Sequence, residues 1–277
     1  MVYLIYVFLF LFGLCIGSFL NVVIYRLPRG LSIGKGRSFC PKCKKKLLWW
    51  ELIPLFSFIF LKGRCSKCKV KISLQYPIVE LTTGILFLLA FFRLTCGSGF
   101  MVRDLLPIIY VWTIISILIA IFFIDLKHYI IPDSLIIVGS ALSLIYLLMF
   151  QFFDNLQPVF YNSKILIFFY RFLPISSFKF QVSSLFLNHI LFAIIGGAFF
   201  GLIILFTKGR GMGIGDMKFG VLMGLILGSQ LIMALYLSFV SGAIVGILLI
   251  LLKKKSLKSK VPFGPFLVGV TLLFMIL

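Results

Sequence analysis

The chain has 277 residues, of which 62% are hydrophobic and 12% are charged, and its mean hydropathy is +1.19. About a quarter of the residues of a soluble domain are charged, so this composition excludes a soluble fold and indicates an integral membrane protein in contact with lipid. The formal net charge is +20. The basic residues lie in short loops between apolar runs and not on one face of a soluble domain, so we expect no nucleic-acid partner.

Apolar runs recur along the chain, and several reach the roughly 20 residues that a membrane-spanning helix needs. We therefore expect an all-α polytopic membrane protein with about eight transmembrane helices, two of them short for a span. The first run has no basic start and no small-residue cleavage site, so we expect it to be a retained helix. The expected helices are residues 2–24, 78–94, 104–124, 133–152, 187–206, 217–229, 231–252 and 262–277.

These runs divide the chain into three parts. Residues 1–24 form the first transmembrane helix, residues 25–77 form a polar subdomain, and residues 78–277 form the membrane core with an external insert at 153–186. An external amino terminus places 22 of the 27 Lys and Arg residues on the inner face, 13 of them in the polar subdomain. Because cytoplasmic loops are enriched in Lys and Arg, this topology puts the polar subdomain in the cytoplasm.

The polar subdomain contains "CPKC" and "CSKC", two cysteine pairs that are separated by 21 residues. This spacing is typical of a structural zinc site, in which four thiolates hold one tetrahedral ion. Disulfides are the weaker alternative in a reducing cytoplasm. The predicted zinc ligands are Cys40, Cys43, Cys65 and Cys68.

Three of the seven acidic residues, Asp125, Asp133 and Asp216, lie at expected cytoplasmic helix ends. Asp133 fits a helix N-terminus, where free backbone N–H groups and the helix dipole favour a carboxylate. Asp125 follows an apolar run, at a C-terminal helix end whose dipole disfavours an anion. Asp216 follows the glycines of "GMGIGD", at membrane depth, where an ionisable residue is a functional candidate. Asp125 and Asp216 are therefore the candidate catalytic residues.

Two carboxylates from different helices can share one proton, and the pair can then activate water and protonate a departing peptide amine. This chemistry is that of an aspartic protease. The alternative is an ion transporter whose intramembrane aspartates bind cations. Against the transporter, the aspartates lie at one face of the membrane and the sequence has no visible inverted repeat.

Six sequence motifs in order together resemble type IV prepilin peptidases, which are membrane aspartic proteases with a glycine-x-glycine-aspartate motif. The resemblance covers the chain except roughly residues 150–186. The motifs are "GSFLNVVIYRLP", the pairs "CPKC" and "CSKC", "ISLQYPIVEL", "IDLKHYIIPD", "GMGIGDMKFG" and "VPFGPFL".

The resemblance implies that the enzyme cleaves the basic leader of prepilins and pseudopilins after a glycine, on the cytoplasmic side of the bacterial cytoplasmic membrane. It assigns catalysis to Asp125 and Asp216, with Asp133 as a further family position. We expect Gly213 and Gly215 to allow close backbone approach beside Asp216, and Lys218 to be an interfacial anchor. These three residues and Asp133 are the supporting residues of the prediction.

Many family members also methylate the new amino terminus, often a phenylalanine, with S-adenosylmethionine, an activity associated with the tetracysteine block. Because all four cysteines are present, the chain resembles the bifunctional type. Glu51 and Glu80, the only acidic residues at the block, are candidates for binding an ammonium group or a ribose. A peptidase without methyltransferase activity is the alternative.

Overall fold

The structure is a computed structural model that describes residues 2–95, 104–152, 185–209, 211–252 and 261–276. The insert expected at 153–186 lies outside these residues, apart from its last two, which open a helix. The described chain is almost entirely helical, and its only β pairing consists of two isolated bridges.

Eight of the described helices are apolar and at least 13 residues long, as expected for a polytopic membrane protein. They are α1 (Val2–Arg26), α3 (Gln75–Thr95), α4 (Leu105–His128), α5 (Asp133–Phe152), α7 (Leu185–Thr207), α8 (Ile214–Leu227), α9 (Leu231–Leu251) and α10 (Gly264–Ile276).

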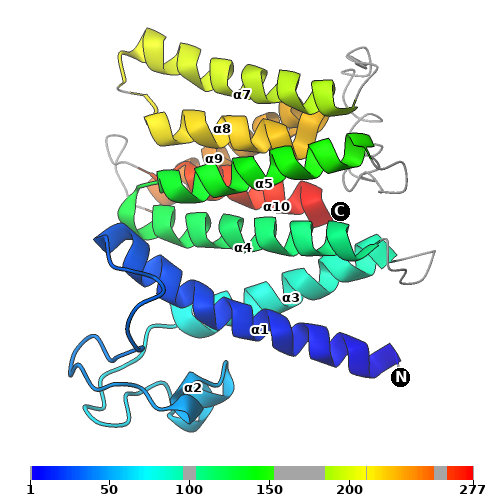
Figure 1. Cartoon of the computed structure of the whole chain (residues 1–277). Coiled ribbons are helices and arrows are strands. Elements are labelled where there is room, and N and C mark those ends of the chain that lie inside the picture. Colours follow the sequence, from blue (N-terminus) through cyan, green and yellow to red (C-terminus); the bar gives the residue numbers. More distant parts are fainter. Residues whose placement is uncertain (1, 96–103, 153–184, 210, 253–260, 277) are drawn as a thin grey trace.

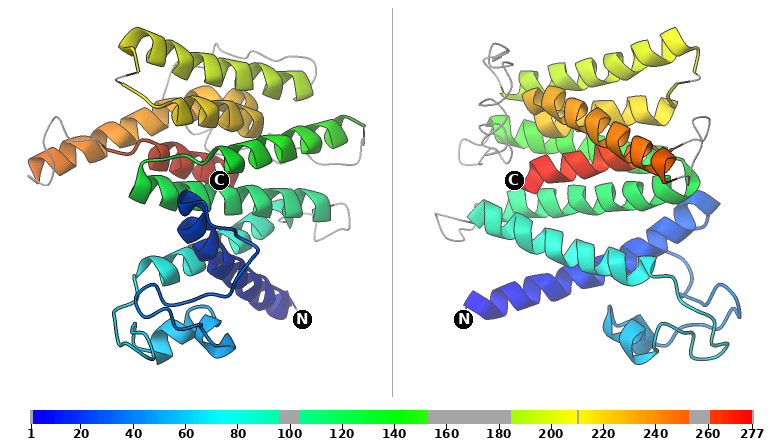
Figure 2. Two further views of the ribbon diagram at one scale, coloured as in Figure 1. Left: turned by 60° about the vertical axis from the view of Figure 1, so that its left-hand side comes forward. Right: turned by 180° about the vertical axis from the view of Figure 1, so that it is seen from behind.

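By length and composition, six helical segments of the described chain can cross a membrane. The last of them, Ile214–Leu251, contains both α8 and α9. These two are joined by the short helix η5 (Gly228–Gln230), where Gly228 has a φ of 54°, and α9 returns obliquely across the bundle (Figure 2). At 14 and 13 residues, α8 and α10 are the short helices, as the sequence predicts.

Several helices extend past the apolar runs that predict them, and α4 matters most for function. The run predicts an end at residue 124, whereas α4 continues through a polar last turn to His128. It ends where Tyr129 adopts a left-handed conformation (φ 56°) and donates its N–H to the carbonyl of Asp125 at 2.9 Å. This cap satisfies a free carbonyl at the helix end. Asp125 is consequently inside the helix and not beyond it.

The helices form two groups around α4, the most buried of them. α1 and α3 pack against each other and against one side of α4, while α5 and α10 also contact α4 and α7 packs against α8 (Figure 1). A Cβ on Gly13 would lie 2.7 Å from the Cα of Gly84, so α1 and α3 approach almost to backbone contact. Small residues permit such close helix packing in membranes.

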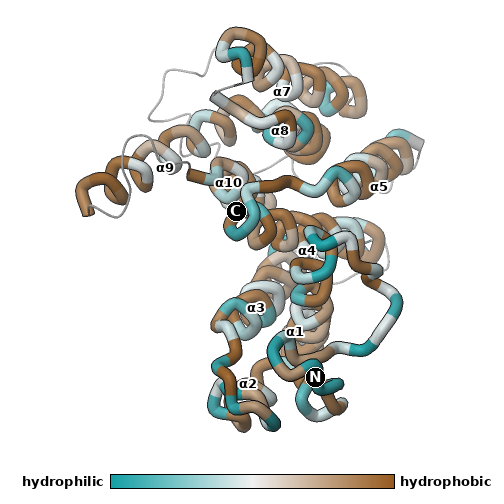
Figure 3. Tube along the Cα trace, turned by 90° about the vertical axis from the view of Figure 1, so that its left-hand side faces the viewer, coloured by the Kyte–Doolittle hydropathy of each residue, from teal (hydrophilic) through white to brown (hydrophobic). Residues whose placement is uncertain are grey.

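The two chain ends lie at one end of the bundle, and the polar segment between α1 and α3 lies at the other (Figure 1). We call this segment, residues 27–74, the cysteine subdomain. It contains η1 (Leu27–Arg29), η2 (Trp49–Leu52) and α2 (Phe56–Phe60). Hydrophilic positions concentrate in this subdomain and at the helix ends beside it, whereas the helices are mostly hydrophobic (Figure 3).

One buried cation, Arg26 at the end of α1, organises the start of the cysteine subdomain. Its side chain is 6% exposed, and its guanidinium donates only to backbone carbonyls. Because a buried charge needs hydrogen-bonding partners, these bonds fix the loop against the helix end. The acceptors are the carbonyls of Ser32, Ile33, Lys35, Gly36 and Arg37, at 2.7–3.3 Å.

Candidate functional site

Asp125 occupies the last turn of α4 and is 5% exposed. The negative end of the α4 dipole disfavours this carboxylate, and the start of α10 offsets that effect. The backbone N–H of Gly264, the first residue of α10, donates a hydrogen bond to Asp125. A Cβ on Gly264 would collide with Oδ2 of Asp125, so only glycine allows this approach.

Asp216 occupies the first turn of α8, where the glycines position it. Gly213 is the N-cap, and its N–H donates to Oδ2 of Asp216 at 3.1 Å. A Cβ on Gly215 would lie 3.1 Å from Cβ of Ile131, so the small residue lets α8 pack against the turn between α4 and α5. The side chain of Asp216 is half-buried, at the end of a helix that stabilises an anion.

The two carboxylates lie near enough for the charge of Asp216 to act on Asp125. They come from the C-terminal end of α4 and the N-terminal end of α8, which lie at the same end of the bundle as the cysteine subdomain (Figures 1 and 2). The N-termini of α8 and α10 supply N–H donors to this pair. Helix N-termini are suitable for holding negative charge, so the arrangement can keep acidic groups together in a partly buried place.

Asp133 is the first residue of α5, at a helix N-terminus as predicted. Its Oδ1 accepts a hydrogen bond from Nζ of Lys218 at 2.7 Å, and the two side chains are 62% and 39% exposed. The ion pair joins the starts of α5 and α8. The sequence did not reveal this pairing, because 84 residues separate the partners and neither lies in a local charge pattern.

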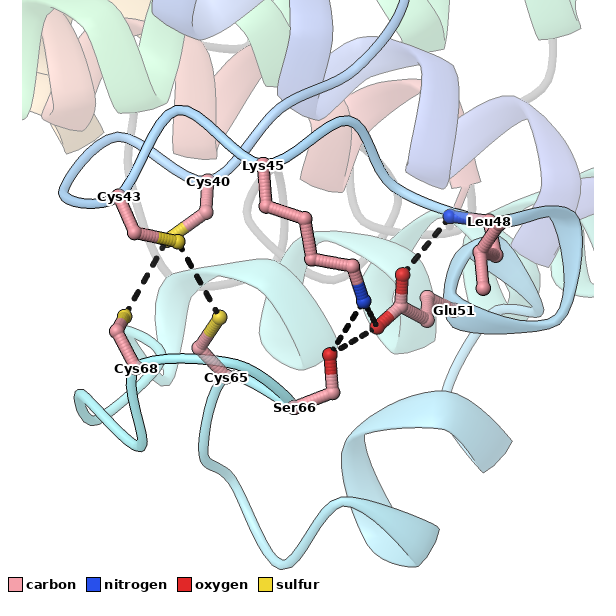
Figure 4. A network of polar contacts seen from close by, with 8 residues as sticks. All are labelled: Cys40, Cys43, Lys45, Leu48, Glu51, Cys65, Ser66 and Cys68. Atoms are coloured by element: carbon pink, nitrogen blue, oxygen red, sulfur yellow. Dashed lines mark hydrogen bonds and ion pairs between the residues drawn. The ribbon is translucent and has the colours of Figure 1, made fainter.

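The four predicted metal ligands converge at one place, and all their sulfur atoms lie within 4.8 Å of one another. Sγ of Cys40 lies 3.9 Å from Sγ of Cys68, and Sγ of Cys43 lies 4.0 Å from Sγ of Cys65 (Figure 4). A tetrahedral ion with Zn–S bonds of about 2.3 Å places its sulfurs roughly 3.8 Å apart. The cluster therefore fits a structural zinc ion.

The two cysteine pairs lie in turns with one backbone pattern. Cys40 and Lys45 pair through N–H···O at 2.9 Å, and Cys65 and Val70 do the same. Each turn closes with an isolated bridge. Backbone N–H groups of Cys68 and Lys67 lower the pKa of the Cys65 thiol to about 6, which favours the thiolate that a metal binds.

Glu51, one of the two candidate methyltransferase residues, holds the two cysteine turns together. Its carboxylate accepts from Nζ of Lys45 at 2.9 Å, from the hydroxyl of Ser66, and from the N–H of Leu48 at 2.8 Å (Figure 4). Burial acts to raise its pKa, but the hydrogen bonds from Ser66, Leu48 and Lys45 outweigh burial and hold the pKa below its usual range. Both oxygens of Glu51 are thus engaged inside the subdomain, where they join the two cysteine turns.

Glu80, the other candidate, lies on α3 and is 8% exposed. It accepts from the N–H of Leu55 at 2.8 Å and from the side chain of Ser18 on α1. It therefore connects both membrane helices to the cysteine subdomain. The site residues thus fall into two groups. The aspartate pair lies on one side of the end of α4, and the cysteine subdomain, with Glu51 inside it and Glu80 on the adjoining α3, lies on the other.

Sequence reasoning missed Gly264, although the quoted motif "VPFGPFL" contains it. A glycine followed by proline is a signal for the first turn of a helix, where proline needs no N–H partner. It also missed Arg26, which lies in "GSFLNVVIYRLP" and looks like an ordinary interfacial cation.

Fold and site together define a polytopic membrane protein that brings two carboxylates from different helices together beside a tetracysteine subdomain. A family model described as "Bacterial Peptidase A24 N-terminal domain" matches residues 11–94, and one described as "Type IV leader peptidase family" matches residues 112–250. No solved structure matches the chain.

Similar curated proteins carry the name "Prepilin leader peptidase/N-methyltransferase". One from Legionella pneumophila is 32% identical over 93% of this chain and 86% of its own length, and one from Bacillus subtilis (strain 168) is 32% identical over 93% and 88%. A protein of the same name from Myxococcus xanthus (strain DK1622) is 47% identical over 48% of this chain and 37% of its own length. The chain belongs to the type IV leader peptidase family, as its motifs predict.

Proposed function

We propose that the protein is a bifunctional membrane enzyme that cleaves the leader peptide of type IV prepilins or pseudopilins and then methylates the new amino terminus. The proximity of Asp125 and Asp216, on two different helices at one end of the bundle, is the observation that carries the peptidase activity. The names of the relatives support the same pair of activities.

In the proposed cleavage, the two aspartates hold one proton between them, so that one acts as a base and the other as an acid. The ionised carboxylate takes a proton from water, and the resulting hydroxide attacks the carbonyl carbon of the scissile bond. The protonated carboxyl group gives its proton to the leaving nitrogen, the C–N bond breaks, and a carboxylate and an amine are released. The N–H groups of Gly213 and Gly264 keep the carboxylates oriented.

We infer that the protein lies in the bacterial cytoplasmic membrane with the aspartate pair and the cysteine subdomain on the cytoplasmic side. The excess of Lys and Arg in the segments at that end supports this orientation. In this arrangement the basic leader stays in the cytoplasm, next to the anionic lipid surface, while the apolar helix of the pilin lies in the bilayer. The scissile bond then falls at the interface, at the level of the aspartates.

For the methyl transfer, S-adenosylmethionine, when bound, would supply an electrophilic methyl group to the amine that cleavage releases, with loss of one proton from that amine and departure of S-adenosylhomocysteine as the S–CH₃ bond breaks. The four cysteines hold zinc in a structural role, because a closed tetrathiolate site leaves no position open for a substrate. The zinc ion fixes the two turns of the cysteine subdomain against each other. Glu51 adds a second link between the same turns.

The test is to incubate the purified protein with a purified prepilin and S-adenosylmethionine and to measure the mass of the product. We expect loss of the leader mass and then a gain of one methyl group at the new amino terminus. An unchanged prepilin mass would contradict the peptidase. Cleavage with no added methyl group would show that the protein is a peptidase without methyltransferase activity.

A further inference from the structure

A cavity of about 700 Å³ lies between the cysteine subdomain and the ends of α1 and α3. Its lining comes from α1, α3 and the subdomain together, so none of the three encloses it alone. A volume of this size is typical of sites for small organic ligands. Among the lining residues are Ser18, Asn21, Tyr25, Phe39, Tyr76 and Glu80.

Asn21 lines this cavity and has an unsatisfied side-chain acceptor. The residue is 5% exposed, and its side-chain N–H groups donate to the carbonyls of Gly17 at 3.3 Å and Tyr76 at 3.1 Å. These bonds fix the orientation of the amide and leave Oδ1, which is buried, with no partner in the described structure. A buried polar atom without a partner is costly, so a ligand that donates a hydrogen bond is expected here.

Glu80 adds a carboxylate at the same packing interface between α1 and α3. A Cβ on Gly17 would lie 2.6 Å from Cα of Glu80, Asn21 lies one turn beyond Gly17, and Tyr76 lies one turn before Glu80. The carboxylate accepts from the N–H of Leu55 and the side chain of Ser18. No Lys or Arg of the described chain forms an ion pair with it, so its charge has only neutral partners.

Aromatic and basic side chains both contribute to the remaining wall. They are the aromatic residues Phe19, Tyr25, Phe39, Phe58 and Tyr76 and the basic residues Arg26, Arg29, Lys42, Lys71 and Lys127. Tyr25 and Phe39 pack edge to face with centroids 6.3 Å apart, and each already has a cation of this chain over its ring, Arg29 at 4.1 Å and Lys44 at 5.3 Å from the centroid. Aromatic faces bind organic cations and stack with planar bases. A buried carboxylate, a free amide oxygen, basic side chains and aromatic rings together suit a ligand that carries an ammonium group, a carboxylate and a purine.

We propose that this cavity binds S-adenosylmethionine, with Glu80 and Oδ1 of Asn21 receiving its α-ammonium group, the basic side chains of the lining receiving its carboxylate, and the aromatic side chains facing its adenine. The inference rests on the methyltransferase half of the proposed function and gives that half a location. The membrane helices, and not the cysteine subdomain alone, carry the recognition residues. Zinc and Glu51 act indirectly, by holding the outer wall in place.

The cavity also extends to the end of α4, which carries one of the two aspartates. Lys127, in the last turn of α4, lines the cavity, whereas Asp125 in the same turn contacts the start of α10. Residues two apart on a helix do not face each other, so the aspartates and the cavity lie on two sides of one helix end. A new amino terminus released at the aspartates needs to pass only this helix end to reach the methyl donor.

The test measures binding of S-adenosylmethionine to the full-length, zinc-loaded protein by titration calorimetry. We expect Glu80→Gln and Asn21→Leu each to weaken binding about tenfold or more, since each removes a hydrogen bond to a charged group. Gln75→Leu is the matched control. Its side-chain oxygen is also buried and unpartnered, but it lies outside the cavity lining, so affinity changes by less than about twofold. Prepilin cleavage by each variant reports that the fold is intact.

A second measurement does not depend on the variants. An S-adenosylmethionine analogue that lacks the α-amino group is expected to bind the unaltered protein about tenfold more weakly or worse. Unchanged affinity for this analogue, or unchanged affinity in both cavity variants, would overturn the proposal. A rise in KM for a peptide with a free amino terminus, with S-adenosylmethionine affinity unchanged, would assign Glu80 to the acceptor amine and also overturn it.

These outcomes separate this inference from the proposed function. If the unaltered protein transfers the methyl group but both cavity variants bind S-adenosylmethionine normally, only the assignment of this cavity is contradicted. Failure of the unaltered protein to transfer a labelled methyl group removes the methyltransferase itself.

Discussion

Gly264, the first residue of α10, donates its backbone N–H to the carboxylate of Asp125 in the last turn of α4. The contact places the positive end of one helix dipole against an anion that lies at the negative end of another. It explains how α4 can keep a carboxylate in its last turn.

We predict that Gly264→Ala lowers kcat/KM for prepilin cleavage by about two orders of magnitude, because the new Cβ displaces the Asp125 carboxylate and small misplacements of reacting groups are that costly. Gly269→Ala is the control, since it adds a methyl group to the same helix with nothing within 4 Å. Cleavage rates of the two variants at equal expression decide the matter. Equal rates would show that the Gly264 contact does not position Asp125.

The ion pair between Asp133 and Lys218 is expected to support the site only weakly. Exposed ion pairs contribute about 0–1 kcal/mol, so Lys218→Gln and Asp133→Asn are each expected to slow cleavage only a few-fold, with a smaller effect at high salt. A double-mutant cycle on cleavage rates measures the coupling between the two residues. A loss of more than about a hundredfold in Lys218→Gln alone would instead give Lys218 a direct catalytic part.

The zinc site is predicted to matter more for methylation than for cleavage. Cys40→Ser removes one of four ligands, so zinc is expected to be lost and the cysteine subdomain to loosen. The aspartates lie on α4 and α8, which pack in the membrane core without the subdomain. We expect metal analysis to find one zinc ion in the unaltered chain and none in the variant, with a methylation loss at least tenfold greater than the cleavage loss. Equal losses would contradict a separate structural role for zinc.

Glu51→Gln is expected to destabilise the zinc-bound subdomain by about 1–3 kcal/mol, because one buried oxygen that accepts hydrogen bonds becomes an NH₂ group facing donors. The pKa of Glu51 is held low in the folded state, chiefly by hydrogen bonds that outweigh its burial. Its contribution is therefore complete above the unfolded pKa of about 4.3 and is lost as the pH falls through the folded pKa.

Chelator competition for zinc, measured from neutral to acid pH, checks the Glu51 prediction. The unaltered protein is expected to hold zinc more tightly than Glu51→Gln at neutral pH, and this difference in zinc affinity is expected to disappear as the pH falls. A difference in zinc affinity that stays constant down to acid pH would mean that the charge of Glu51 does not stabilise the zinc-bound subdomain.

Hydrophobic runs are enough to predict the helical class and most helices, because every membrane helix must be apolar over its length. Helix ends are harder, as α4 shows. Its last turn is polar, and what ends it is the left-handed backbone of Tyr129, which no composition signal marks.

The cysteine spacing predicts the metal cluster because both ligand pairs are local in the chain. The contacts of Asp125 with Gly264 and of Asp133 with Lys218 are not predictable in the same way. Each joins helix ends that are far apart in the sequence, and only the packing of the bundle brings them together. The cavity beside Asn21 likewise needs three parts of the fold at once.

Joint action of Asp125 and Asp216 as one catalytic pair is tested most directly by the rate at which Asp125→Asn, Asp216→Asn and the double variant cleave a purified prepilin. The account predicts that each single change abolishes leader removal, that the double variant is no worse, and that Asp133→Asn still cleaves. Normal prepilin processing by either single variant, inserted and folded like the unaltered protein, would contradict it.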